Sequence, residues 1–141
     1  MAGKTFPDIY CSKMKADRLT VYLASTAKGA FRVGLGLNRF SHPVPFFRQM
    51  FPAAHLTEND QANRPLAEAV EAALRNAPRG NALSMDVSFT PFQGAVLEAI
   101  AAIPFGQTRT YGAVASMVGR PLAARAVGQI MGRNPLPLVF P

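Results

Sequence analysis

The sequence has little cysteine, few acidic residues and no long apolar run. Cys11 is its one cysteine, which excludes an internal disulfide framework and a zinc site made of several thiolates. No apolar stretch approaches the roughly 20 residues that span a bilayer. The start, MAGKTFPDIY, lacks the apolar core of a signal peptide. These absences predict a soluble, intracellular protein.

Eight acidic residues stand against fifteen lysines and arginines, which gives a net charge of +7. This excess favours an acidic partner, and nucleic acid is the common one. It also serves as a plain solubility device, so charge alone leaves both interpretations open. A hydrophobic content of 49% suffices for a packed core, and 141 residues allow one ordinary domain or two small ones.

The early part of the chain alternates apolar and polar side chains. This period of two covers residues 18–37 on both sides of the loop STAKG. It predicts a β-hairpin with one buried face. Residues 38–62 are rich in proline and show little periodicity, which predicts a loop with a short helix near FFRQMF.

Residues 63–80, NRPLAEAVEAALRNAPRG, carry both a start and a stop signal for a helix. Asn63 can cap it, apolar side chains recur every four residues, and the NAPRG segment breaks it. Alternation from Leu83 to Phe89 then predicts a strand. Residues 1–88 are therefore expected to form a small α+β domain.

The pattern changes at Thr90, where TPFQ forms a capping box before an apolar helical stripe. Thr110 caps a second short helix, YGAVASMV. A third helix, PLAARAVGQIM, is expected to begin at Pro121 and to end at Gly132. Two short helices joined by a glycine turn are typical of a helix-turn-helix. Residues 89–141 are therefore expected to form a second domain.

The third predicted helix has small side chains on its outer face. Leu122, Ala126 and Ile130 recur at four-residue spacing as its expected core stripe, with Arg125 and Gln129 on a neighbouring face. Such a surface can approach DNA closely and bind its backbone and shape, but it reads base edges poorly. Simple packing of a small-residue helix against its neighbour explains the same pattern.

The segments TPFQGAVLEAI, IPFGQTRTYGAVASMVGRP and AARAVGQIMGRNPLPLVFP resemble the C-terminal domain of O6-alkylguanine-DNA alkyltransferases in order and spacing. The preceding residues resemble, more weakly, the ribonuclease-H-like N-terminal domain of that family. The resemblance implies an α+β fold with domains 1–88 and 89–141. It also implies a cytoplasmic, nucleoid-associated monomer that binds double-stranded DNA through the minor groove, with no cofactor and no metal.

The family's activity, direct alkyl transfer from O6-alkylguanine or O4-alkylthymine to a protein cysteine, requires the nucleotide to be rotated out of the duplex. Arg125 matches the arginine that fills the vacated stack, for which a planar guanidinium suits better than lysine. Tyr111 matches the tyrosine that crowds the adjacent phosphate and helps to protonate the leaving guanine. The thioether product is stable, so each protein molecule would act once.

Three more positions match family roles. Asn134 matches an asparagine that orders the turn before the nucleophile, although a plain turn residue before a proline is the simpler interpretation. Pro137 matches a proline that lines the alkyl pocket, and Gly128 a small position where the backbone meets the minor groove. Ile130 departs from the smaller family residue, and the sequence does not decide between a narrower DNA approach and a better core.

The apolar ending RNPLPLVFP bears on activity. In the family a Cys-His-Arg sequence with the nucleophile follows this proline directly, and the present sequence stops at Pro141. We therefore expect a truncated chain that lacks the reactive cysteine and is inactive alone.

Other reactive residue types give weak signals. Cys11 is far in sequence from Asn134, and a lone cysteine is more often inert, even with a basic Lys13, Lys15 and Arg18 cluster nearby. We expect that cluster to be a solvated face. His42 and His55 lack metal-ligand spacing.

Two other classes of function stay open. A non-catalytic binder of alkylated lesions would share the helix-turn-helix, although such relatives of the family usually lack the first domain. A helix-turn-helix regulator would need base-reading side chains, which alanine, glycine and one arginine supply poorly.

Overall fold

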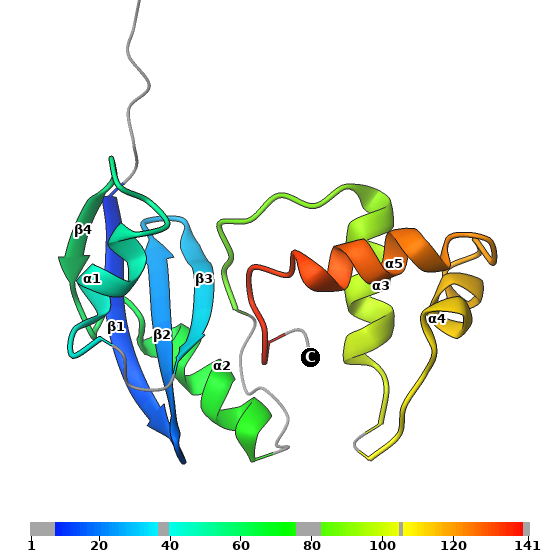
Figure 1. The fold of residues 1–141 in the computed structure, drawn as a ribbon, viewed down its shortest axis with the longest axis horizontal. Coiled ribbons are helices and arrows are strands. Elements are labelled where there is room, and N and C mark those ends of the chain that lie inside the picture. The colour runs from blue at the N-terminus through cyan, green and yellow to red at the C-terminus, as the bar shows by residue number, and fades with distance from the viewer. Residues whose placement is uncertain (1–7, 37–39, 76–82, 105, 140–141) are drawn as a thin grey trace, which may run out of the picture. The chain divides into compact units, whose positions relative to one another are not determined.

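The computed structural model describes residues 8–36, 40–75, 83–104 and 106–139. The chain divides into two compact units, Met1–Val87 and Ser88–Pro141 (Figure 1). Within the described ranges, the first unit holds a four-stranded sheet with two helices, and the second holds three helices. The α+β fold predicted from the sequence is confirmed.

The strands of the first unit follow the order β3-β2-β1-β4. β1 (Asp8–Ala16) pairs antiparallel with β2 (Leu19–Thr26), which pairs antiparallel with β3 (Gly29–Gly36). β4 (His55–Glu58) lies parallel to β1 at one edge of the sheet. The predicted hairpin is therefore confirmed as β2 and β3, and its last predicted residue, Leu37, lies outside the described residues.

Strand β2 is buried on both faces, so the single buried face predicted for the hairpin is wrong. All seven residues of the range 20–26 are buried. The Tyr22 ring stacks on Phe46 of α1 (Pro43–Arg48), with ring centroids 3.9 Å apart. Helix α2 (Arg64–Leu74) also packs against β2. Helix α1 therefore covers Tyr22, which the alternation marked as exposed.

Two strands were missed and one predicted strand is absent. No strand was predicted at β1 and only a loop at β4. β1 pairs with its chain neighbour β2 through the turn at Asp17 and Arg18, whereas β4 pairs with β1, far earlier in the chain. The predicted strand from Leu83 to Phe89 reduces to an isolated bridge between Ala30 and Met85. Backbone hydrogen bonds flank this bridge, from Ala30 N to Ser84 O at 2.8 Å and from Asp86 N to Ala30 O at 2.7 Å.

Helix α2 starts after Asn63, as predicted, but the Asn63 side chain does not cap it. Its amide Nδ2 instead donates to the Tyr10 carbonyl oxygen at 2.9 Å, which ties the helix start to β1. Glu71 and Arg75 form an i,i+4 ion pair at 3.4 Å. The NAPRG segment that was expected to end this helix lies outside the described residues.

The second unit consists of α3 (Pro91–Ala101), α4 (Tyr111–Met117) and α5 (Ala124–Gly132). Both predicted threonine caps are confirmed. Thr90 Oγ1 accepts from Gln93 N at 3.1 Å while Gln93 Oε1 accepts from Thr90 N at 2.9 Å, a complete capping box. Thr110 Oγ1 accepts from Ala113 N at 3.0 Å.

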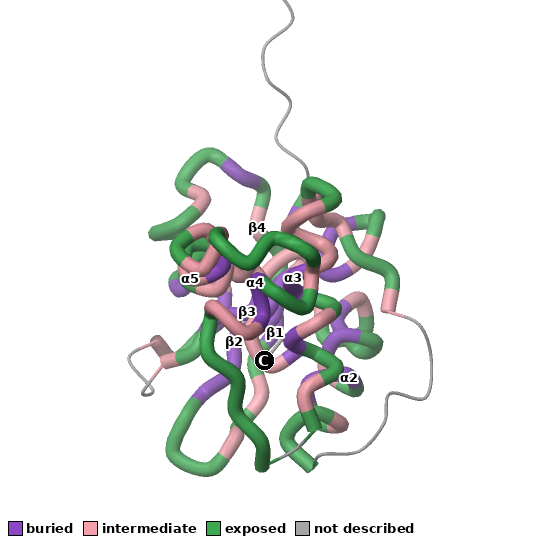
Figure 2. Tube along the Cα trace, turned by 90° about the vertical axis from the view of Figure 1, so that its right-hand side faces the viewer, coloured by how far each residue is buried: buried purple, intermediate pink, exposed green. Residues whose placement is uncertain are grey.

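Buried residues of all three helices form the core of the second unit; Figure 2 colours buried residues purple. These core residues are Val96 and Ile100 of α3, Val114 and Ala115 of α4, and Val127 of α5. Helix α5 begins at Ala124, three residues later than predicted, because residues 121–123 form a turn. Among the described residues, no helix is long and apolar enough to cross a membrane.

Candidate nucleic-acid interface

Helices α4 and α5 pack against each other and are joined by residues 118–123. Gly119 in this connection has φ +80°, a left-handed conformation that favours glycine. Arg120 follows, and its guanidinium carbon lies 5.1 Å from the centre of the Phe92 ring of α3. The three helices are thus held together as the predicted helix-turn-helix requires.

Tyr111 and Gly128 are in direct contact across α4 and α5. A Cβ atom built on Gly128 would lie 3.1 Å from Cε2 and 3.2 Å from Cδ2 of the tyrosine ring. The missing side chain at Gly128 therefore lets the ring rest against the backbone of α5. Tyr111 still exposes 52% of its surface, so the outer part of the ring is open to a ligand.

Arg125 lies one helical turn before Gly128 on α5, which places both on one side of the helix. Its side chain is exposed. Within the described part of the chain, no hydrogen bond or ion pair engages its guanidinium. The structure thus brings together three predicted site residues. Arg125 is exposed, the Tyr111 ring is half-exposed, and Gly128 lies beneath that ring.

Asn134 and Pro137 lie in the segment that follows α5. Asn134 Oδ1 accepts from Leu136 N at 2.9 Å, and Leu136 is fully buried. Asn134 therefore fixes the turn that leads into the proline-rich segment. Leu138, two residues after Leu136, has φ +74°, which is unusual for a residue other than glycine. Phe140 and Pro141 lie outside the described residues.

An open cavity of about 240 Å³ lies between the start of α3 and the end of α5. Its polar lining includes Gln93, Gln129 and Arg133, which were not predicted as site residues from the sequence. Ile130 lines this cavity and packs against the core of the unit. The larger side chain of Ile130 therefore contributes to the core, one of the two roles that the sequence left open.

The predicted core stripe of the third helix is wrong in one member. Leu122 precedes α5 and is 99% exposed, while Ala126 and Ile130 are partly buried. Val127 is the fully buried residue of α5. The stripe failed because it was counted from a helix start at Pro121, where the chain forms a turn.

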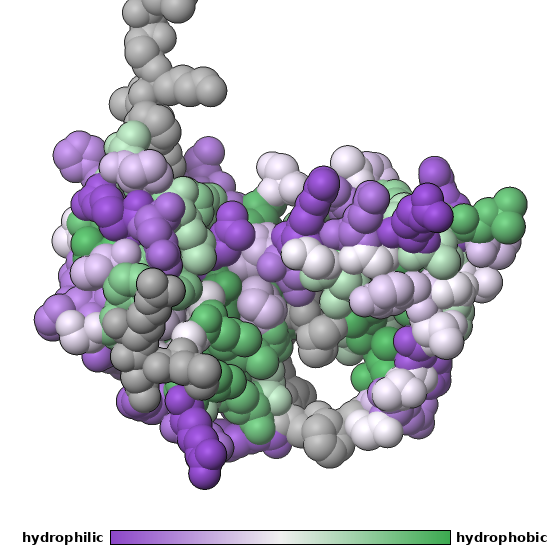
Figure 3. All heavy atoms as spheres, in the orientation of Figure 1, coloured by the Kyte–Doolittle hydropathy of each residue, from purple (hydrophilic) through white to green (hydrophobic). Residues whose placement is uncertain are grey.

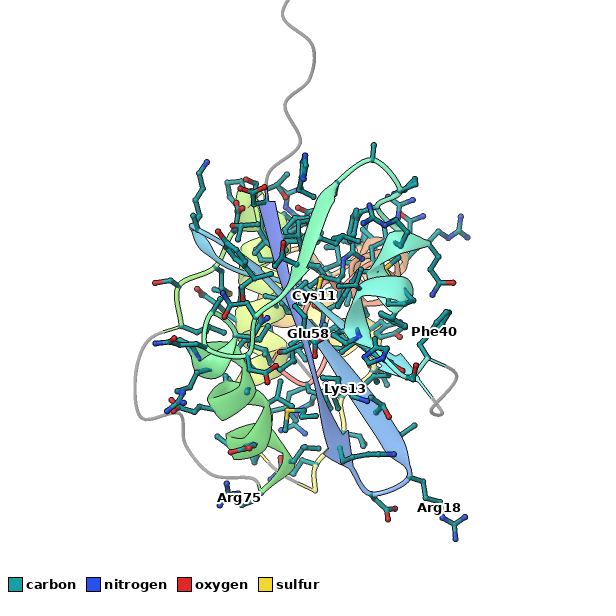
Figure 4. All side chains as sticks on the ribbon, turned by 90° about the vertical axis from the view of Figure 1, so that its left-hand side faces the viewer. Cys11, Lys13, Arg18, Phe40, Glu58 and Arg75 are labelled. Carbon is teal, nitrogen blue, oxygen red and sulfur yellow. The ribbon has the colours of Figure 1, made fainter. Side chains whose placement is uncertain are left out.

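Cys11 is fully buried in the middle of β1, beside its β4 partner Glu58 (Figure 4). Burial raises the pKa of its thiol to about 11; Arg48 lowers the pKa, and Glu58 raises it further. Its Sγ donates to the Ile9 carbonyl oxygen at 3.9 Å. A buried thiol that stays protonated at neutral pH is a poor nucleophile, which supports the expectation that Cys11 is inert.

The basic residues near Cys11 do not form one compact group. Lys13 donates from Nζ to the Ser41 carbonyl oxygen at 2.6 Å, whereas Arg18 lies in the turn between β1 and β2 (Figure 4). His42 is the exposed N-cap residue of α1. His55 is the first residue of strand β4, so the loop predicted at this position is wrong. No described group of three or more His, Cys, Asp or Glu residues could hold a metal ion.

Known proteins resemble this chain in sequence and in fold. Residues 91–141 match the family model described as the DNA binding domain of 6-O-methylguanine DNA methyltransferase. An inducible methylated-DNA–protein-cysteine methyltransferase of Bacillus subtilis (strain 168) is 32% identical over 135 residues, which are 96% of this chain and 75% of that protein. A methylated-DNA–protein-cysteine methyltransferase of Methanosarcina acetivorans is 39% identical over 88 residues, which are 60% of this chain and 54% of that protein.

The fold is similar to that of a solved structure. The crystal structure of Mycobacterium tuberculosis O6-methylguanine methyltransferase superposes with a TM-score of 0.68 at 26% identity, over 94% of this chain and 75% of that one. The similarity therefore extends over both units of the chain.

Proposed function

Since the chain belongs to the methylated-DNA–protein-cysteine methyltransferase family, we propose that it acts in the repair of O6-alkylguanine by transfer of the alkyl group to a protein cysteine. In this proposal residues 89–141 bind double-stranded DNA through the minor groove and hold the damaged nucleotide outside the stack. O4-alkylthymine is a second substrate of the same chemistry. The contact between Tyr111 and Gly128, with Arg125 open one turn earlier, is the observation that carries the proposal.

Arg125 keeps the duplex open after the nucleotide rotates out. Rotation costs a few kcal/mol of stacking and pairing energy. A planar guanidinium recovers part of this energy by stacking on the neighbouring bases and hydrogen-bonding the unpaired partner. Arg125 suits this role because its side chain is exposed and no described residue engages it.

Tyr111 acts on the guanine that leaves. An acceptor thiolate attacks the alkyl carbon, so that a sulfur–carbon bond forms while the bond from carbon to O6 breaks. The guanine takes the bonding electron pair and gains a proton, which the Tyr111 hydroxyl supplies. One edge of the ring lies against Gly128, and in this proposal that contact supports the ring beside the DNA.

Asn134 and Pro137 shape the alkyl side of the site in this proposal. The hydrogen bond from Leu136 N to Asn134 Oδ1 orders the turn, and Pro137 contributes an apolar wall for the alkyl group. The acceptor thiolate is not Cys11, because that thiol is buried and protonated. Residues 1–141 contain no other cysteine, so the acceptor thiolate of this step is not one of these 141 residues.

Further parts of the proposal concern the whole chain. We assign residues 1–88 to a ribonuclease-H-like domain and residues 89–141 to the DNA-binding domain. The protein acts as a monomer in the cytoplasm, associated with the nucleoid when it is bound to DNA. A non-catalytic lesion binder would use the same surface, and both functions require that the chain opens a damaged duplex.

The proposal is tested by the opening of a duplex that carries O6-methylguanine next to the fluorescent base 2-aminopurine. We expect the 141-residue chain to raise the fluorescence, because the base next to a rotated nucleotide is unstacked. The Arg125→Ala variant should lose most of this rise, since no side chain then holds the gap open.

Arg109→Ala is the matched control. It removes the same charge from the same unit, but Arg109 lies in the loop before α4 and its guanidinium bonds to Thr108 and Gln107. A rise that is equally large with Arg125→Ala and with Arg109→Ala would refute the role of Arg125. No rise with the unmodified chain would refute the proposed function.

A further inference from the structure

Leu122 is a large apolar side chain that packs against nothing. It precedes Ala123, the N-cap residue of α5, and it is 99% exposed. An apolar residue at this position often packs against the fourth residue of the helix, here Val127. Val127 is fully buried in the core formed with α3 and α4, so Leu122 forms no such contact. The turn between α4 and α5 carries an apolar projection next to hydrophilic side chains (Figure 3).

The surroundings of Leu122 point to one kind of partner. In the described part of the second unit, the other exposed large apolar side chains are Tyr111 and Met117, both on α4. Arg125 and Gly128 lie one turn apart on α5, and Gly128 carries the Tyr111 ring. Leu122 precedes Arg125 by three residues, in the turn that leads into α5. The apolar projection therefore lies next to the helix start that the proposed function places against DNA.

The charge of the second unit supports the same partner. Residues 88–141 carry one acidic side chain, Glu98, against four basic ones, which are Arg109, Arg120, Arg125 and Arg133. A positive surface attracts the phosphates of nucleic acid. Proteins that bind the minor groove combine arginine with apolar side chains, and leucine is among those that enter between base steps.

We propose that Leu122 is an apolar DNA contact that packs on the deoxyribose and base edges of the minor groove beside Arg125. This inference rests on the proposed function and adds a DNA-contacting residue to it. Leu122 lies at the edge of the gap that the rotated nucleotide leaves in the base stack, and Arg125 fills this gap. When Leu122 docks, water leaves both its side chain and the DNA surface that it covers. Truncation of Leu122 to alanine should therefore lower the affinity for DNA about five- to tenfold.

The test measures binding of the 141-residue chain to a duplex that carries O6-methylguanine, by fluorescence anisotropy at several salt concentrations. We expect Leu122→Ala to weaken binding about five- to tenfold at every salt concentration. The slope of log affinity against log salt should not change, because no phosphate contact is lost. Leu122→Lys should steepen this slope by about one, because the added charge lies next to a phosphate.

Leu74→Ala is the control, because Leu74 is an apolar side chain that is 47% exposed in the first unit. It should bind like the unmodified chain. Circular dichroism and thermal unfolding should be the same for both Leu122 variants, since the side chain has no packing to lose.

Several outcomes overturn the inference. Equal affinity of Leu122→Ala and the unmodified chain would do so, as would an equal loss with Leu74→Ala. A fall in the Hill coefficient alone would assign Leu122 to a contact between copies of the chain. If Leu122→Ala binds normally while Arg125→Ala does not open the duplex, the inference fails and the proposed function stands. If the unmodified chain does not bind the duplex at all, both fail.

Discussion

At the scale of single residues, one missing methyl group decides how α4 and α5 meet. Gly128 lies inside α5, where glycine costs about 1 kcal/mol of helix stability relative to alanine. The Tyr111 ring occupies the space that a Cβ would need. The glycine therefore weakens the helix in order to place the ring, which is the trade expected at a functional position.

Gly128→Ala should separate stability from function. The added Cβ, 3.1 Å from Cε2 of Tyr111, would displace a ring that is half exposed and free to move outward. We expect the free energy of unfolding to stay the same or to rise by up to about 1 kcal/mol, measured by urea denaturation. Opening of the O6-methylguanine duplex should fall severalfold, measured with 2-aminopurine.

The matched variant is Gly94→Ala in α3, where nothing lies within 4 Å of the added Cβ. It should raise stability by about 1 kcal/mol and leave duplex opening unchanged. Unimpaired opening by Gly128→Ala would show that the position of the Tyr111 ring does not matter.

At the scale of the secondary-structure elements, local signals predicted the helix caps and one hairpin but failed at other positions. The threonine caps and the β2–β3 hairpin were predictable because each depends on neighbours in sequence. β1 was missed although it pairs with its chain neighbour β2, and β4 was missed because its partner β1 lies far earlier in the chain. The start of α5 was misplaced because Pro121 fits a first helical turn as well as it fits the turn it forms.

The same contrast applies to the candidate site. Sequence similarity selected Tyr111, Arg125 and Gly128, and the structure brings them together on α4 and α5. Periodicity alone placed Leu122 in the core, although it is exposed. The exposure of a residue next to a helix start depends on where the helix begins, and that boundary is the least certain part of a pattern.

The capping box of α3 should make a measurable contribution to the free energy of unfolding. Thr90→Ala removes the acceptor for Gln93 N, so we expect the free energy of unfolding to fall by about 1 kcal/mol. Thr90→Ser keeps the hydroxyl and should lose only a few tenths of that amount. Urea denaturation of both variants tests this, and equal stability of Thr90→Ala and the unmodified chain would contradict it.

At the scale of the whole molecule, the two units have separate cores and separate chemistry. The aromatic cluster of α1 and the sheet stabilises the first unit, and the apolar helix contacts stabilise the second. The one thiol lies in the first unit, whereas Arg125 and Tyr111 lie in the second. The one thiol and the residues that are proposed to contact DNA therefore lie in different units.

This separation predicts that the 141-residue chain does not become alkylated. Incubation with DNA that carries labelled O6-methylguanine should leave the label on the DNA, because the raised pKa of Cys11 keeps its thiol protonated at neutral pH. Intact-mass measurement checks this result. Label on Cys11 of the folded chain would contradict the inert role of this residue.

The enclosure of Cys11 also makes the chain a ready background for tethering experiments. A cysteine introduced at an exposed position would be the only accessible thiol in the folded state. Thiol-bearing oligonucleotides could then be cross-linked at chosen points of α4 and α5, and the path of the duplex mapped residue by residue, without first removing a native side chain.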